Sequence, residues 1–232
     1  YNEAILRVYN RFGRRDNKFK ARIKILVRAL TAEGFAAKVN EEWQHLKNGP
    51  ATLTEEEVQR VSLHFTEPDY LVLEDEQELL AQQDLEYPGF ARWRSRNTRA
   101  HKKPGYVSVI LSLKKTGVAP GDITAKQLDA LADLADRYSF CEVRGTREQN
   151  IVLADIEQRQ LWQLWQEIRE LGFATPNIGL LSDIVCCPGG DYCALANAKS
   201  IPVAEAIQQR FDDLDFLFDI GDLDLNISGC MN

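Results

Sequence analysis

The sequence predicts an α+β protein, in which a helical N-terminal region precedes a segment with the element order β, α, β, β, α. Apolar residues recur at helical spacing in the first part of the chain, alternate with period two near residue 106, and return to helical spacing after residue 124. The chain has 232 residues, of which 44% are hydrophobic, so it is long enough to bury one or two cores.

Helices are expected in the N-terminal region. The helical spacing of apolar residues extends from Ala4 to Leu30, with an interruption at Gly13, and reappears from Glu33 to Leu46. Another short helix is expected after Thr54, because Thr54 followed by Glu57 is a capping-box pattern.

A change of pattern follows residue 63. Residues 64–103 combine prolines and charges with little periodicity, so we expect an irregular connector there. Tyr106 to Leu113 alternates as a strand does, and Thr124 starts an amphipathic helix. Two short strands, Phe140–Arg144 and Ile151–Ala154, are expected around a polar turn and before a second amphipathic helix. This order begins a ferredoxin-like split βαβ arrangement, with the helices on one face of an antiparallel sheet.

From residue 175 the chain becomes rich in Pro and Gly, and a helix is expected from Ala194 to Arg210. The sequence therefore predicts four parts, which are a helical region, a connector, a ferredoxin-like domain and a cysteine-bearing domain: residues 1–63, 64–103, 104–174 and 175–232.

The composition excludes several classes of protein. A net charge of −7 argues against general binding to nucleic acid, and no apolar run is long enough to span a membrane. No signal peptide is apparent, so we expect a cytoplasmic protein with reduced thiols. The chain starts without Met and stops two residues after Cys230, and we therefore expect a fragment of a longer protein.

The cysteines indicate a metal site. Cys187 and Cys193 are separated by Pro-Gly-Gly-Asp-Tyr, an open backbone that lets amides approach a bound sulfur, and Cys193 is expected to begin a helix. A helix amino end favours the thiolate, which is the form that binds iron–sulfur clusters. Paired cysteines also bind zinc or pack as small apolar residues, so both alternatives stay open. Cys230, in a second turn-like segment, would be a third ligand, whereas Cys186 and Cys141 are expected to be buried.

Two segments carry a family resemblance: Ser182 to Asn197 and Ser228 to Asn232 closely resemble the cluster region of sulfite and nitrite reductase hemoproteins, above all the proteobacterial sulfite reductases. The family pattern is Cys, five residues, Cys, then a distant Cys, three residues, Cys. This chain matches the first three cysteines. The resemblance implies a [4Fe-4S] cluster and a siroheme as cofactors, with a fourth thiolate that bridges them and lies beyond this sequence.

The resemblance covers nearly the whole chain, because Val8 to Val27 also looks like the segment that ends the family's first half. In this family two similar halves face each other across the siroheme. This chain would hold the end of the first half, then the ferredoxin-like half-domain and a truncated siroheme and cluster domain. The basic residues that surround substrate belong mostly to the absent half, so the catalytic residues are unknown.

The resemblance also indicates cofactor contacts. Arg15, Lys18 and Arg22 fall at i, i+3 and i+7, so a helix would place them on one face, where they could bind the carboxylates of siroheme or form a solvated basic face. The turn from Arg144 to Asn150 resembles a loop that occurs in both family halves. It has Glu148 where the first half has a base, which favours a supporting role toward the cofactor.

Within that turn, Gln149 and Asn150 are the expected siroheme contacts, with Arg144 or Arg147 as further candidates. The alternative is a hairpin turn with solvated charges. Asn232 matches a position that lies against the siroheme in relatives.

The resemblance implies that the parent protein is an oxidoreductase that reduces sulfite to sulfide by six electrons, with a flavoprotein subunit or a ferredoxin as electron donor. An assimilatory nitrite reductase of the same family is the alternative within enzymes. A non-catalytic ferredoxin-like module that holds zinc is the alternative of another class. The isolated fragment is expected to be inactive.

Overall fold

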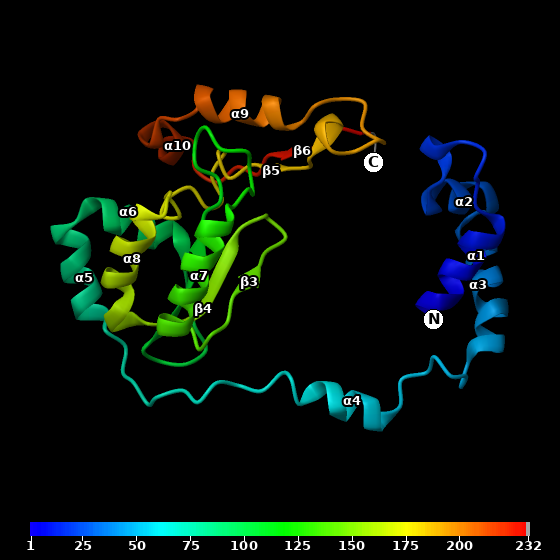
Figure 1. Ribbon diagram of the computed structural model, residues 1–232, viewed down its shortest axis with the longest axis horizontal. Helices are drawn as coiled ribbons and strands as arrows, with labels where there is room; N and C mark the ends of the chain where they lie inside the picture. The colour runs from blue at the N-terminus through cyan, green and yellow to red at the C-terminus, as the bar shows by residue number, and fades with distance from the viewer. Residues whose placement is uncertain (231–232) are drawn as a thin grey trace. The chain divides into compact units, whose positions relative to one another are not determined.

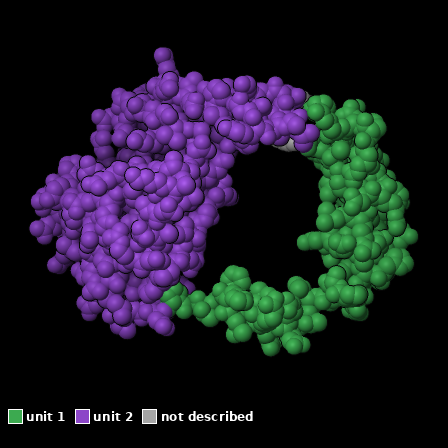
Figure 2. Space-filling view, viewed as in Figure 1, with its two compact units in different colours: residues 1–68 green, residues 69–232 purple. Residues whose placement is uncertain are grey.

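The structure is a computed structural model that describes residues 1–230 (Figure 1). The chain forms two compact units, Tyr1–Pro68 and Asp69–Asn232, which are coloured separately in Figure 2. Helices dominate the first unit, and the second unit combines helices with an antiparallel sheet. The predicted α+β class is therefore confirmed.

The first unit consists of helices α1 (Asn2–Phe12), α2 (Ile23–Leu30), α3 (Ala32–Leu46) and α4 (Glu55–Ser62), with a 3₁₀ turn at Lys18–Lys20. Its small core is formed by Ala4, Val8 and Val39, which are buried between α1 and α3. The expected helix after Thr54 is confirmed as α4, and the Thr54 hydroxyl accepts a hydrogen bond of 3.2 Å from the backbone N–H of Glu57.

The second unit is built on a four-stranded antiparallel sheet with the order β1-β2-β4-β3: β1 (Thr98–Ala100), β2 (Tyr106–Leu111), β3 (Arg144–Gly145) and β4 (Ile151–Glu157). The central pair aligns Val107 with Ile156 and Val109 with Leu153, with an irregularity in register between the two valines. Because side chains alternate between the faces of a strand, one face of this pair is apolar.

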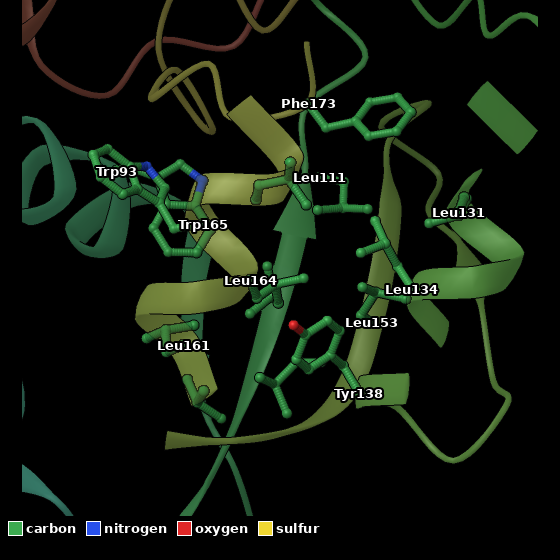
Figure 3. Close-up of a cluster of buried hydrophobic side chains, with 14 of the residues drawn as sticks. Trp93, Leu111, Leu131, Leu134, Tyr138, Leu153, Leu161, Leu164, Trp165 and Phe173 are labelled. Atoms are coloured by element: carbon green, nitrogen blue, oxygen red, sulfur yellow. The ribbon is translucent and has the colours of Figure 1, made fainter. Parts of the chain in front are cut away.

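Helices α7 (Ala125–Tyr138) and α8 (Leu161–Glu170) pack on that apolar face and complete the core in Figure 3. The buried residues that Figure 3 labels are Trp93, Leu111, Leu131, Leu134, Tyr138, Leu153, Leu161, Leu164, Trp165 and Phe173. The element order β2, α7, β3, β4, α8 is the predicted split βαβ arrangement. Thr124 caps α7, and Gln127 completes the capping box.

Much of the expected irregular connector is regular structure, so that prediction is wrong over residues 77–100. This stretch forms α5 (Gln77–Glu86), α6 (Pro88–Asn97) and β1. Phe90 and Trp93 of α6 are fully buried in the core of the second unit. The basic residues between them and beyond them face acids of the same unit, in three ion pairs: Arg92–Asp215, Arg94–Asp84 and Arg96–Asp222.

Two shorter elements also differ from expectation. The strand expected at Phe140–Arg144 forms only at its end, as β3 (Arg144–Gly145), because Phe140 and Cys141 both adopt left-handed backbone angles, with φ of 47° and 61°. The helix expected from Ala194 begins only at Ile201 as α9 (Ile201–Arg210), and it is followed by α10 (Leu214–Ile220). Within residues 1–230, no helix is both long enough and apolar enough to cross a bilayer.

Candidate thiol site

Two short parallel strands bring distant cysteines onto neighbouring loops. β5 (Val185–Cys186) pairs with β6 (Asn226–Ile227), and the pairing continues where the backbone N–H of Cys187 donates to Ile227 O at 3.1 Å. Cys230 lies on the loop that follows β6. The strands rest on a small core of Ile184, Cys186 and Ala204, so Cys186 is buried as predicted.

The sulfur of Cys187 is bonded from two sides. The backbone N–H of Gly229 donates to Cys187 Sγ at 3.1 Å, and Ser200 Oγ lies 3.3 Å from the same sulfur. The Ser200 hydroxyl, followed by the Gly229 amide, lowers the pKa of the Cys187 thiol below its ordinary value. This sulfur therefore has the surroundings that a metal-binding thiolate needs.

Glycine is required where the two loops touch. A side chain at Gly189 would place its Cβ 2.5 Å from the backbone nitrogen of Ser200, and one at Gly229 would come 2.6 Å from Ala198 O. A backbone hydrogen bond from Gly190 N to Ala198 O at 2.9 Å closes the first loop on itself, and the bond from Asn197 N to Gly229 O at 2.8 Å joins it to the second loop. The sequence predicts an open backbone between Cys187 and Cys193. In the structure this glycine-rich backbone packs closely against the loop that contains Gly229.

The other two expected ligands lie on the same loops. The backbone N–H of Cys193 donates to Gly189 O at 2.9 Å, and Cys230 Sγ lies 3.8 Å from Ser228 Oγ. Cys193 does not begin a helix, so that expectation is wrong. Hydrogen bonds to the second loop hold the backbone after Cys193 in a loop conformation, and α9 starts only after Ser200.

The donor chemistry of these loops fits an iron–sulfur cluster, which thiolates bind and amide N–H groups stabilise. Nevertheless, the part of the chain that the structure describes contains no group of three His, Cys, Asp or Glu side chains arranged to hold a metal ion. The assignment of Cys187, Cys193 and Cys230 as ligands therefore stays a prediction.

Cys141 is exposed, in contrast to the expectation that it is buried. It follows α7 at the left-handed turn described above, and the pKa of its thiol is raised, chiefly by a hydrogen bond with Asp136. Burial raises the pKa of the Cys186 thiol, as it does for a small apolar residue in a core.

The side chains of Gln149 and Asn150 are engaged within the protein. Gln149 Nε2 donates to Cys186 O at 2.8 Å, and Cys186 N donates to Gln149 Oε1 at 2.9 Å. Asn150 is buried, accepts from Leu113 N at 3.1 Å and donates to Asp183 Oδ1 at 2.9 Å. Contacts between these two residues and siroheme remain a prediction.

Arg15, Lys18 and Arg22 do not share one helix face, so the expected helical arrangement of these three residues is wrong. Arg15 lies in the loop after α1, Lys18 lies in the 3₁₀ turn, and Arg22 precedes α2. Arg15 donates to Asn10 Oδ1 at 2.9 Å, and its guanidinium carbon lies 4.6 Å from the centre of the Tyr9 ring. Their binding to siroheme carboxylates stays a prediction.

Asn232 falls outside the described residues. Two contributors to the site were not predicted: the Ser200 hydroxyl and the buried Lys114–Asp183 pair, in which Nζ lies 3.2 Å from Oδ1. Ser200 carried a weak signal, because it directly precedes the Ile-Pro that opens α9. The Lys114–Asp183 pair joins positions far apart in the sequence and left no local pattern.

Known proteins share both parts of this structure. Residues 100–171 match the model of the nitrite/sulfite reductase ferredoxin-like half domain, which is the class that the β2, α7, β3, β4, α8 order defines. Residues 1–47 match the nitrite and sulphite reductase 4Fe-4S domain. The chain belongs to the nitrite/sulfite reductase family. Residues 1–47 contain no cysteine, and the loops around Cys187 and Cys230 lie outside both matches.

Similar proteins include nitrite and sulfite reductases. The chloroplastic ferredoxin–nitrite reductase of Betula pendula is 27% identical over 219 residues, which are 90% of this chain and 31% of that protein. Sulfite reductase [ferredoxin] 2 of Mycolicibacterium paratuberculosis is 28% identical over 126 residues, or 52% of this chain and 22% of that protein. This chain therefore spans about a third or less of the length of these relatives.

A solved structure agrees with the fold. The Mycobacterium tuberculosis NirA protein has a TM-score of 0.58 and 21% sequence identity, with 98% of this chain and 35% of that chain covered. The relatives described here do not favour sulfite over nitrite, so the expectation of a sulfite reductase is supported only at the level of the family.

Proposed function

We propose that this chain is part of a reductase that delivers six electrons to nitrite or sulfite, with a siroheme and a [4Fe-4S] cluster as cofactors. One observation carries the proposal: Cys187 Sγ accepts an amide hydrogen bond of 3.1 Å from the loop that bears Cys230. In a chain of the nitrite/sulfite reductase family, such a sulfur suits a cluster ligand.

In this proposal Cys187, Cys193 and Cys230 bind cluster iron, and a fourth thiolate lies beyond Asn232. When bound, the cluster supplies electrons one at a time. The Gly229 amide would stabilise negative charge on the Cys187 sulfur, and hydrogen bonds of this kind raise a cluster's reduction potential.

Siroheme is the second proposed cofactor. Arg15, Lys18 and Arg22 would meet its carboxylates, because basic side chains near one turn can pair with several carboxylates without a shared helix face. Asn150 and Asn232 are the other proposed contacts. The amide of Gln149 is bonded to the backbone of Cys186, which points to a different role for this residue.

Nitrite is the first substrate to test, because several of the similar proteins are named nitrite reductases, and sulfite is the second. Ferredoxin is the proposed electron donor for the same reason, with a flavoprotein as the alternative. The chain alone is expected to be inactive. A reducing compartment such as the cytoplasm is part of the proposal, since the thiols must stay reduced.

The test uses the native holoprotein that contains this chain. Iron and acid-labile sulfide would be measured together with ammonium formed from nitrite and sulfide formed from sulfite, with reduced ferredoxin as donor. Cys193→Ser is expected to abolish the cluster, whereas the exposed Cys141→Ser should leave it intact. Full iron and sulfide content in Cys193→Ser would contradict the ligand assignment, and a colourless protein with one equivalent of zinc would favour the zinc-binding module.

A further inference from the structure

The side chain of Gln149 takes the place of a strand beside β5. Alternate peptide groups of a strand point to opposite sides. Val185 N and Cys187 N point to β6, where they donate to Leu225 O and Ile227 O at 3.0 and 3.1 Å. The N–H and C=O of Cys186 point the other way, and both bond to the amide of Gln149, at 2.9 and 2.8 Å. The backbone before Cys187 is thus held from both sides.

Gln149 itself sits in a constrained turn. Its φ is 60°, a left-handed conformation that is uncommon for a residue with a side chain. The turn is closed by hydrogen bonds from Thr146 N to Asn150 O at 2.9 Å and from Gln149 N to Thr146 O at 3.2 Å. The surrounding structure therefore maintains a strained backbone that directs this amide toward Cys186.

A second buried connection lies one residue away on the same turn. Asp183 Oδ1 accepts from Asn150 Nδ2 at 2.9 Å and from Lys114 Nζ at 3.2 Å, and Asp183 Oδ2 accepts from Gly179 N at 3.0 Å. Lys114 also donates to the carbonyl of Glu148 at 2.5 Å. The turn and the segment that leads into β5 are consequently joined at two points, which limits their relative movement.

We propose that Gln149 is a positioning residue whose amide fixes the backbone of Cys186 and thereby holds the sulfur of Cys187 in place for the iron–sulfur cluster. This inference rests on the proposed function. It differs from the siroheme contact that the family resemblance implies, because the donor and acceptor of the amide are already bonded to Cys186.

The experiment compares variants of the holoprotein. Gln149→Met keeps the length of the side chain and removes both hydrogen bonds, and Gln149→Glu keeps the acceptor for Cys186 N only. Gln127→Met is the matched control, because Gln127 also bonds to backbone on both sides, from Thr124 N at 3.0 Å and to Leu171 O at 2.9 Å, away from the cysteine loops.

The readouts are iron and sulfide per chain, the rate at which the visible absorption of the cluster disappears with an iron chelator, the electron paramagnetic resonance spectrum of the reduced cluster, and the melting temperature. Gln149→Met is expected to lose its cluster at least about tenfold faster than the wild-type protein, as is typical when a residue that orients a metal ligand is changed. The rate of cluster loss in Gln149→Glu should fall between the rates in the wild-type protein and in Gln149→Met. Gln127→Met should lose its cluster at the wild-type rate.

The outcomes separate the two proposals. Wild-type cluster stability and an unchanged spectrum in folded Gln149→Met would overturn the inference and leave the proposed function standing. Equal cluster loss in Gln127→Met would overturn it as well, since the effect would then be general destabilisation. Absence of iron and sulfide from the wild-type holoprotein would overturn the proposed function, and the inference with it. If Gln149→Met does not fold, Gln149→Glu decides by the same criteria.

Discussion

At the scale of single residues, Lys114 is unusual because its ammonium group is buried in the second unit. Burial lowers the pKa of Lys114 below its ordinary value, although Asp183 acts in the opposite direction. A buried charge is tolerated only when it is paired and hydrogen-bonded, and here Asp183 Oδ1 and Glu148 O provide the partners. The pair therefore serves the geometry of the chain more than its net stability.

Removal of one partner should be costly. Lys114→Met is expected to lower the free energy of unfolding by about 3–5 kcal/mol, because it leaves the buried carboxylate of Asp183 without its cation. Urea denaturation measures this change. Lys115→Met is the control, and a change within about 0.5 kcal/mol is expected there because Lys115 is exposed.

The double variant Lys114→Met/Asp183→Asn provides the decisive comparison. It removes both charges, so it should be more stable than Lys114→Met alone. A double variant that is less stable than Lys114→Met by the full effect of Asp183→Asn would show that the two residues act independently, and it would contradict this account.

The candidate site could be predicted only in part at this scale. The spacing of Cys187 and Cys193 and the glycines between them are local signals, and the structure places both cysteines on the loop that touches the Cys230 loop. The role of Gln149 could not be predicted, because it depends on which peptide groups of β5 face away from β6. A pairing register is a tertiary property, and no local sequence pattern encodes it here.

At the scale of elements, too, features that local sequence encodes could be predicted, whereas features that depend on tertiary contacts could not. The amphipathic helices were predicted well because their apolar spacing is local, as α3 and α7 show. In α6 the closely spaced arginines resembled a polar loop, yet Phe90 and Trp93 bury one side of the helix while the arginines pair with acids. Those acids lie elsewhere in the sequence, so the charge pattern of α6 alone was misleading.

Helices α7 and α8 are joined by a polar contact at the edge of the core. Tyr138 OH donates to Glu167 Oε1 at 2.7 Å, and Arg137 donates to both oxygens of the same carboxylate, at 3.1 and 2.5 Å. Burial, followed by the hydrogen bond to Glu167, raises the pKa of Tyr138 to about 12. The folded protein therefore retains this phenol proton at a pH where the unfolded chain releases it.

This difference predicts a loss of stability in alkali. The unfolded phenol ionises near its ordinary pKa of about 10, so above that pH the unfolded state binds fewer protons than the folded state. The contribution of Tyr138 is fully present below pH 10 and should decline as the pH rises toward about 12. Denaturation of the wild-type protein and of Tyr138→Phe between pH 10 and about 12 measures this contribution of Tyr138 to the free energy of unfolding. A Tyr138→Phe variant with the same pH dependence as the wild-type protein would contradict the assignment.

At the scale of the whole chain, two cores of very different size are joined by a segment with little regular structure. The first unit buries only Ala4, Val8 and Val39 in its cluster, whereas the second unit has the large core of Figure 3. Leu63 and Phe65, between α4 and the second unit, are 74% and 81% exposed. Residues 66–76 are neither helix nor strand. Cleavage by a protease should therefore begin near residue 65.

Limited digestion of the 232-residue chain by chymotrypsin tests this expectation, with mass spectrometry to locate the first cut. The enzyme is expected to cleave after Leu63 or Phe65 and to spare Tyr70, although all three suit its preference for large apolar side chains. Tyr70 OH donates to the buried Asp155 at 2.7 Å, and the next backbone N–H, that of Leu71, donates to Tyr106 OH at 3.0 Å. These bonds hold the segment after residue 69 against the second unit, so a protease cannot bind it in extended form. Leu63→Ser/Phe65→Ser should slow the first cut, and an initial cut at Tyr70 in the wild-type chain would show that this segment is not held in place.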